Sequence, residues 1–228
     1  MRYNNIHKGI FLSRPNRFIA NVEIDGRVEV CHVKNTGRCK ELLIPGAEVR
    51  LEKVSNPDRR TAFDLVAVQK GERLINMDSQ APNKAVGEWL REKKPFGGDM
   101  EVFSEKTHGS SRFDFYLQSD KTDRKIFMEV KGCTLERNGV AMFPDAPTER
   151  GVKHIIGLAD CIDEGFEAYV LLLIQMKDIK YFTPNYETHP EFGEALKAAE
   201  KRGVKILCYD CIVTPDSMTL DKPVEIKL

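Results

Sequence analysis

The chain has 228 residues, which is enough for one large domain or two small ones. A hydrophobic fraction of 41% and an aromatic fraction of 8% are those of an ordinary globular protein. Its 35 lysines and arginines balance 35 aspartates and glutamates, which excludes a chain that is basic throughout but permits a basic face opposite an acidic one. The N-terminus leads into no signal-like apolar stretch, and the longest apolar run, residues 168–174, is too short to span a bilayer. We therefore expect a soluble cytoplasmic protein with no membrane partner.

The first 78 residues predict an all-β domain. Short alternating runs recur at residues 18–24, 27–33, 47–54, 61–69 and 73–77. Asp25-Gly26 joins the first two runs and is a strong hairpin signal, while Pro45-Gly46 and Asn56-Pro57-Asp58 mark later turns. Five short strands in this length suit a small barrel, and the OB-fold is a five-stranded barrel that binds oligonucleotides. We therefore expect an OB-like barrel over residues 1–78.

Two basic loops of this domain carry the residue types that contact phosphate groups. The residues that we assign to nucleic-acid binding here are Arg14, Arg17, Lys34, Arg38 and Lys40. Three aromatic residues, Tyr3, Phe11 and Phe18, could either offer stacking faces to bases or fill the core of the barrel.

Residues 79–228 predict an α/β domain, because helices alternate there with buried strands. Helices are expected from Pro82-Asn83 to about residue 92, at 149–164 after the N-cap Thr148, and at 190–202 before Gly203. The expected strands cover residues 112–117, 126–131, 168–176, 179–182 and 204–208. The whole chain is thus expected to be a two-domain α+β or α/β protein with a mixed sheet in its second domain.

A β-hairpin in the second domain carries the most informative group of charges. Two alternating segments flank the polar turn 118–125, and a symmetric turn would place Asp114 opposite Glu129. Lys131 is two residues beyond Glu129, so both side chains are expected on one face of the strand. Two carboxylates placed directly opposite repel each other, and a divalent cation such as Mg²⁺ would remove that penalty. The layout is that of a magnesium-dependent nuclease.

The spacing of an acid two residues before a lysine is not informative by itself. It also occurs by chance at Glu92, Asp123, Asp178 and Glu225. The Glu129 occurrence differs from these because it ends an apolar strand that has a hairpin partner with an aspartate. Glu88, on the preceding helix, is either a third carboxylate of the site or an exposed helix residue.

A basic helix face follows the hairpin. Arg150, Lys153 and His154 have i, i+3 and i+4 spacing, so they share one face of the expected helix. This face could hold phosphate groups above the site, or it could be an ordinary solvated surface.

Other chemistries find less support. His108 and Ser110-Ser111 lie near Asp114, but the Gly-x-Ser-x-Gly elbow of a serine hydrolase is absent. Gly97-Gly98 lacks the lysine of a phosphate-binding loop. The CxxC spacing of Cys208 and Cys211 has no second pair, so we expect free thiols at all cysteines.

Several longer motifs together resemble the sugar fermentation stimulation protein A family. The motifs are Asn16-Arg17-Phe18, Asn35-Thr36-Gly37-Arg38, residues 42–46, Arg112-Phe113-Asp114-Phe115, Glu129-Val130-Lys131 and residues 143–154. The resemblance implies an N-terminal OB-like domain and a C-terminal domain similar to the PD-(D/E)XK nucleases. It implies a DNA-binding protein with a role in regulating sugar (maltose) utilisation genes. One departure is Phe113, which stands where that superfamily often has a proline.

Two functions are consistent with these residues. In the first, the chain is a metal-dependent nuclease in which Asp114, Glu129 and the Val130 carbonyl hold Mg²⁺ or Mn²⁺, and Lys131 orients water or offsets charge. In the second, it is a non-catalytic DNA-binding regulator on an inactive nuclease scaffold, although no helix-turn-helix signature is evident. A third hypothesis is that the barrel binds RNA or an oligosaccharide. A homodimer is compatible with each of these.

Overall fold

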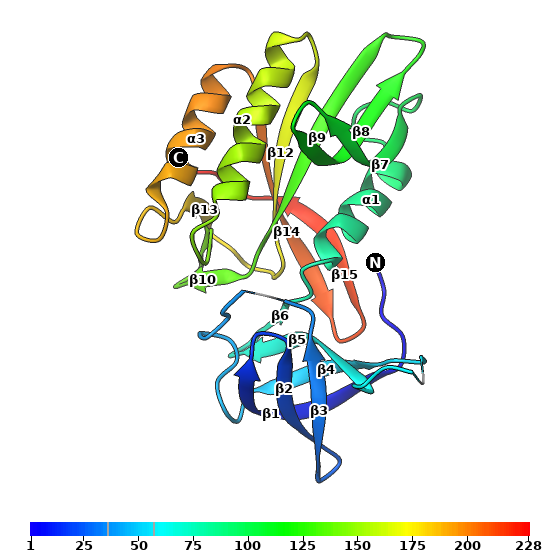
Figure 1. Ribbon diagram of the computed structural model, residues 1–228, viewed down its shortest axis with the longest axis vertical. Coiled ribbons are helices and arrows are strands. Elements are labelled where there is room, and N and C mark those ends of the chain that lie inside the picture. Colours follow the sequence, from blue (N-terminus) through cyan, green and yellow to red (C-terminus); the bar gives the residue numbers. More distant parts are fainter. Residues whose placement is uncertain (36, 57) are drawn as a thin grey trace.

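A barrel and a mixed sheet lie one below the other along the long axis of the molecule (Figure 1). The structure is a computed structural model that describes residues 1–35, 37–56 and 58–228. The turn predicted at Asn56-Pro57-Asp58 and the motif that contains Thr36 each include a residue outside the described residues. None of the described helices is long and apolar enough to cross a membrane.

Five strands close the N-terminal barrel in the order β3-β2-β1-β4-β5. They are β1 (Ile6–Asn16), β2 (Ile19–Ile24), β3 (Arg27–Val33), β4 (Glu48–Lys53) and β5 (Phe63–Lys70). Closure is short, because β3 and β5 pair only through His32 with Asp64 and Val33 with Leu65. The predicted hairpin turn is present, since Asp25 and Gly26 have φ values of 50° and 76°.

The predicted number of barrel strands is confirmed, but one of the expected strands lies outside the barrel. The run at 73–77 forms β6 (Arg73–Asn76), which extends the sheet from β5 and lies outside the closed barrel. The fifth barrel strand is instead β1, which carries Gly9 and Pro15 and is mostly half-buried or exposed. Its sequence therefore lacks the clean alternation that identifies a strand.

A mixed six-stranded sheet forms the second domain, in the order β15-β14-β12-β9-β8-β7. The strands are β7 (Glu101–His108), β8 (Ser111–Ser119), β9 (Arg124–Cys133), β12 (Glu167–Ile174), β14 (Lys205–Thr214) and β15 (Ser217–Pro223). A smaller sheet contains β10 (Leu135–Arg137), β11 (Val140–Phe143) and β13 (Tyr181–Pro184). The expected mixed sheet is thus confirmed, and its edge strands β7 and β15 were not expected from the sequence.

Helices cover both faces of the large sheet (Figure 1). α2 (Glu149–Asp163) and α3 (Pro190–Lys201) pack together on one face, and α1 (Ala81–Lys93) lies on the other. Thr148 caps α2 as predicted, because its hydroxyl accepts a hydrogen bond from the Gly151 N–H at 3.0 Å. All six cysteines are buried free thiols, in agreement with the sequence.

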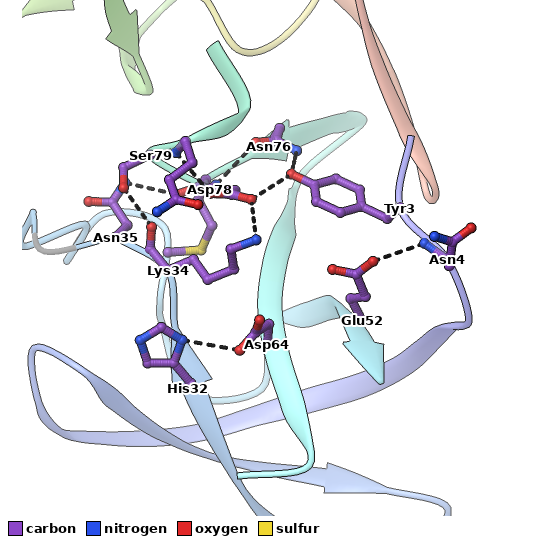
Figure 2. Close-up of polar contacts among 12 residues, drawn as sticks. Tyr3, Asn4, His32, Lys34, Asn35, Glu52, Asp64, Asn76, Asp78 and Ser79 are labelled. Atoms are coloured by element: carbon purple, nitrogen blue, oxygen red, sulfur yellow. Dashed lines mark hydrogen bonds and ion pairs between the residues drawn. The ribbon is translucent and has the colours of Figure 1, made fainter. Parts of the chain in front are cut away.

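A buried polar network joins the two domains (Figure 2). Asp78, in the segment between β6 and α1, is fully buried and accepts hydrogen bonds from the Tyr3 hydroxyl and the Lys34 ammonium. The Tyr3 hydroxyl in turn accepts a hydrogen bond from the Asn76 side chain at 2.8 Å. Because buried polar groups must be paired, this network fixes the first residues of the chain, the barrel and the start of α1 relative to one another.

Candidate functional site

The predicted hairpin forms with the expected register. β8 and β9 pair from Phe115 with Met128 to Ser119 with Arg124, and continuing this register by one step places Asp114 opposite Glu129. The register is readable from the sequence because a symmetric turn sets the pairing of both strands. The regular ladder ends just before these two acids.

Asp114 lies where strand β8 departs from regular geometry. In the ladder between β7 and β8, Glu105 and Asp114 are opposite each other but are not paired, and Glu105 has a φ of 57°. Phe113 and Phe115 pack into different core clusters, although residues two apart on a regular strand share a face. This irregularity turns the carboxylate of Asp114 out of the strand and into a cavity.

That cavity has a volume of about 280 Å³ and lies where the hairpin meets the first turns of α1 and α2. Asp114, Glu129 and Lys131 line it together with Asn83 of α1 and with Arg150 and His154 of α2. The three residues predicted to form a nuclease centre are therefore brought together by the fold.

Two donors hold the carboxylate of Asp114. Its Oδ1 accepts a hydrogen bond from the Asn83 amide at 2.7 Å, and its Oδ2 accepts one from the Val130 N–H at 2.8 Å. Burial and the negative charge of Glu129 nevertheless raise the pKa of Asp114 above its ordinary value. The two carboxylates thus repel each other across the cavity, as the sequence predicted.

Glu129 is 3% exposed, and its two oxygens have different surroundings. Oε1 accepts a hydrogen bond from Lys131 Nζ at 2.7 Å and a second, short one from His154 Nδ1. Oε2 is buried and has no hydrogen-bond partner among the described residues. A buried carboxylate oxygen without a partner is costly, and a bound cation would satisfy it.

The donor set suits a hard cation that keeps part of its shell for water and substrate. Across the described part of the chain, no three His, Cys, Asp or Glu side chains are arranged to hold a metal ion. Asp114 and Glu129 supply two carboxylates, and Mg²⁺ is commonly held by one or two carboxylates plus phosphate oxygens. The residues present therefore fit such an ion.

The basic face predicted on α2 separates into three different environments. Arg150 is exposed and lines the cavity, so it is placed to contact a phosphate group. Lys153 is exposed but is not among the residues that line the cavity. His154 is buried and bonded to Glu129, so its side chain is placed to orient that carboxylate, and its contact with nucleic acid stays a prediction.

Glu88 does not supply a third carboxylate. It is half exposed and forms an ion pair with the N-terminal ammonium group. The polar residue that α1 contributes to the site is Asn83, five positions earlier. Five residues correspond to well over one helical turn and place the two side chains on different faces. The sequence offered Asn83 only as part of the Pro82-Asn83 helix start.

Two of the five cations predicted for nucleic-acid binding on the barrel are used internally. The Arg14 guanidinium donates hydrogen bonds to the carbonyl oxygens of Arg17, Asn35, Gly37 and Arg38, at 2.7 to 2.8 Å. The Lys34 ammonium lies 2.7 Å from the Asp78 carboxylate, and Figure 2 shows this ion pair. Phosphate contact by Lys34 would have to compete with this ion pair, whereas Arg14 still lines the same pocket as the other three cations.

The three remaining barrel cations are exposed. Arg17, Arg38 and Lys40 line one pocket with a volume of about 260 Å³. The Arg17 guanidinium lies 4.7 Å from the centre of the Phe18 ring, which is 44% exposed. The other two candidate stacking residues, Tyr3 and Phe11, are buried in the core.

Comparisons with known proteins agree across the whole chain. Residues 12–77 match the family model described as "SfsA N-terminal OB domain", and residues 80–217 match "Sugar fermentation stimulation protein RE domain". A sugar fermentation stimulation protein homolog of Ruminiclostridium cellulolyticum is 58% identical over 228 residues, with 100% of both chains covered. A homolog of Desulfitobacterium hafniense is 60% identical and covers 100% of this chain and 99% of its own length.

A solved structure is also similar over the full length. It is described as Pyrococcus furiosus SfsA in complex with Ca²⁺, and it has a TM-score of 0.88 and 26% sequence identity. The similarity covers 100% of this chain and 98% of that protein. The arrangement of barrel and mixed sheet is therefore shared with a solved relative.

Proposed function

The chain belongs to the sugar fermentation stimulation protein family, and we propose that it binds DNA and hydrolyses phosphodiester bonds with a divalent cation. The observation that carries this proposal is the buried Oε2 of Glu129, which has no partner among the described residues and belongs to a side chain that lines the same cavity as Asp114. Two repelling carboxylates in a cavity are a costly arrangement that a cation would stabilise.

Asp114, Glu129 and the carbonyl of Val130 would hold the cation, which we infer to be Mg²⁺ or Mn²⁺. The Pyrococcus furiosus relative is described as a Ca²⁺ complex, and Ca²⁺ takes the same class of oxygen ligands. When bound, such an ion supplies positive charge that polarises the scissile phosphate and acidifies the attacking water.

The protein residues around the centre have separate roles in this proposal. The Lys131 ammonium lines the cavity and offsets negative charge that develops on the phosphate. Arg150 binds a phosphate oxygen of the substrate backbone. Asn83 and His154 are positioning residues, because they bond to Asp114 and Glu129 and fix the orientation of each carboxylate.

The two domains have different roles in this proposal. We assign binding of the DNA strand to residues 1–78, which carry Arg17, Arg38 and Lys40, and the chemistry to residues 79–228. The neutral net charge of the chain means that this binding depends on a local basic surface. Its affinity should therefore fall steeply as salt is added.

A specific observation favours a second candidate function. Glu129 Oε1 is already bonded to Lys131 and His154, so this oxygen is satisfied without an ion. A centre stabilised in this way could be an inactive nuclease scaffold. The chain would then be a non-catalytic DNA-binding regulator of sugar (maltose) metabolism genes. The names of its relatives refer to the stimulation of sugar fermentation.

A cleavage assay separates the two candidates. Wild type, Asp114→Ala and the control Asp120→Ala are incubated with single-stranded, duplex and flapped DNA, with and without Mn²⁺. Asp120 is an exposed acid at the far end of the same hairpin. We expect Asp114→Ala to lower the cleavage rate by at least about 100-fold while Asp120→Ala stays near wild type. Binding without cleavage by wild type supports the regulator, and no DNA retention at low salt contradicts both functions.

A further inference from the structure

A cleft between the two domains continues from the candidate metal centre. Ser79 lines both the cavity of the centre and a second cavity of about 350 Å³, which also contains Gly132 and Gln175 of the sheet domain. That second cavity reaches the barrel at Asn35 and Gly37. Gly37 also lines the pocket formed by Arg17, Arg38 and Lys40. These shared lining residues place the three cavities in a row, which we take as a path from the basic pocket of the barrel to Asp114 and Glu129.

A separate branch of this path ends at an exposed aromatic ring. Asn35 and Ser79 also line a pocket of about 190 Å³ that contains Phe18, His32 and Gln80. The Phe18 ring is 44% exposed, although most aromatic residues of the barrel are buried. An exposed ring beside polar side chains can stack on a base while the polar groups contact the base edge.

The charges along the cleft suit a phosphate backbone. Arg17, Arg38 and Lys40 are exposed at its barrel end. Gln80 and Thr148, the N-cap residues of α1 and α2, line its walls, so the positive ends of two helix dipoles open into it.

Acids also lie along this path. Asp78 is paired with Lys34 and carries little net charge toward the cleft. Asp145 is exposed and lies against the barrel loop at Gly37. The metal centre adds its own two carboxylates and the exposed Glu105, which lines the same cavity. At the barrel end, the three exposed cations therefore outnumber the one exposed acid.

The cleft is held in a fixed shape by contacts between its walls. The Ser79 N–H and hydroxyl both donate to the Lys34 carbonyl oxygen, at 3.0 and 2.8 Å. The Asn35 amide donates to the Met77 carbonyl oxygen at 2.9 Å. Figure 2 shows Lys34, Asn35 and Ser79 close together at the end of β3, with His32 below them. These residues are therefore already held in place, so that binding of a ligand does not have to pay the entropy of fixing them.

The barrel and the sheet domain also meet directly across the cleft. A methyl group added at Gly37 would lie 2.6 Å from Asp145 Oδ2, so the barrel loop and the sheet domain approach each other closely here. A duplex would have to pass between these segments with its base faces stacked and unavailable to Phe18. A single strand needs less room and exposes the face of each base.

On the premise of the proposed function, we infer that the cleft binds single-stranded DNA, with one base stacked on Phe18. Its phosphates would contact Arg17, Arg38 and Lys40, and the strand would continue past Ser79 to the metal centre. The substrate class is then a single-stranded segment, such as an overhang or a flap, and not a continuous duplex.

Fluorescence anisotropy of the full-length protein tests this inference. The probes are a fluorescein-labelled oligothymidylate, a DNA duplex of equal length and an RNA strand of equal length, at low salt in EDTA so that no strand is cut. The variants are Phe18→Ala and the control Phe103→Ala, whose ring on β7 is 42% exposed. We expect Phe18→Ala to weaken single-strand binding roughly 5- to 150-fold, which is the effect of one stacked base. Phe103→Ala should stay within about twofold of wild type.

Each other outcome overturns a defined part of the inference. Duplex binding as tight as single-strand binding, or equal affinities for Phe18→Ala and Phe103→Ala, contradicts the single-strand cleft. Tighter binding of RNA than of DNA contradicts the assignment to DNA. The cleavage assay separates this result from the proposed function: duplex cleavage without single-strand binding removes only the inference. Single-strand binding without cleavage by wild type removes only the nuclease.

Discussion

The barrel and the mixed-sheet domain both use basic side chains internally, but for different purposes. In the barrel, Arg14 fixes a loop through carbonyl oxygens and Lys34 pairs with Asp78 at the junction. In the sheet domain, Lys131 and His154 both bond to one oxygen of Glu129, one of the two carboxylates of the candidate centre. We therefore expect that removal of an internal basic side chain lowers stability in the barrel and activity in the sheet domain.

Of the substitutions that test this comparison, Lys34→Ala is expected to have the largest effect, a loss of stability. Its ammonium is mostly buried and pairs with a fully buried carboxylate, so the substitution leaves Asp78 without its counter-charge. We expect the free energy of unfolding to fall by about 3 kcal/mol, measured by chemical denaturation. Lys40→Ala, an exposed control, should change it by less than about 0.5 kcal/mol. Partial recovery in Lys34→Met with Asp78→Asn would identify the unpaired charge as the cause.

His154→Ala tests the opposite expectation in the sheet domain. Loss of its bond to Glu129 should lower Mn²⁺ affinity and cleavage by roughly 10- to 100-fold, as is usual for a residue that orients a metal ligand. Isothermal titration with Mn²⁺ gives a readout that does not require turnover, and His154→Asn should restore part of the affinity. Unchanged Mn²⁺ affinity in folded His154→Ala would show that the histidine only fills space.

Glu136 joins the two domains through an ion pair, and we expect this ion pair to make the stability of the protein depend on pH. Its carboxylate on β10 lies 2.7 Å from Lys70 of the barrel. Burial alone would raise the pKa of Glu136, but Lys70 and the Gly139 N–H outweigh it and hold the pKa below its ordinary value.

A carboxylate whose pKa is lower in the folded state than in the unfolded state stabilises the protein at pH values above its unfolded-state pKa. This stabilisation is lost as the pH falls through the folded-state pKa. Wild-type stability should therefore fall as the pH decreases from about 4.5, and Glu136→Gln should fall less over the same range. The difference is expected to be about 1 kcal/mol, from denaturation at several pH values. Parallel curves for both proteins would contradict this role.

Lys40→Ala should have the smallest effect, since its charge is exposed and has a phosphate as its proposed partner. We expect the slope of log affinity for single-stranded DNA against log salt to decrease by about 0.7, the contribution of one phosphate contact. Lys201→Ala, at an exposed lysine that ends α3 and lines none of these cavities, is the matched control and should leave the slope unchanged. Equal slopes for wild type and Lys40→Ala would remove the basic pocket from the binding path.

Local features of the site were predictable from the sequence. The alternating segments and the polar turn set the β8–β9 register, and the Asp114–Glu129 juxtaposition follows from it. The N-cap Thr148 and the Asp25-Gly26 turn were also predictable, because each depends on residues within a few positions. These features are local because a turn or a cap is closed by neighbours in the chain.

The sequence by itself thus determined the hairpin, most helices and the residue types of the centre. Only the tertiary structure decided which charges are free. Lys34 is paired with Asp78, and His154 is bonded to Glu129. Glu88 forms an ion pair with the N-terminal ammonium group, and the α1 residue that bonds to Asp114 is Asn83. Helical and strand periodicity says which residues share a face, but the partner of that face depends on how remote elements pack.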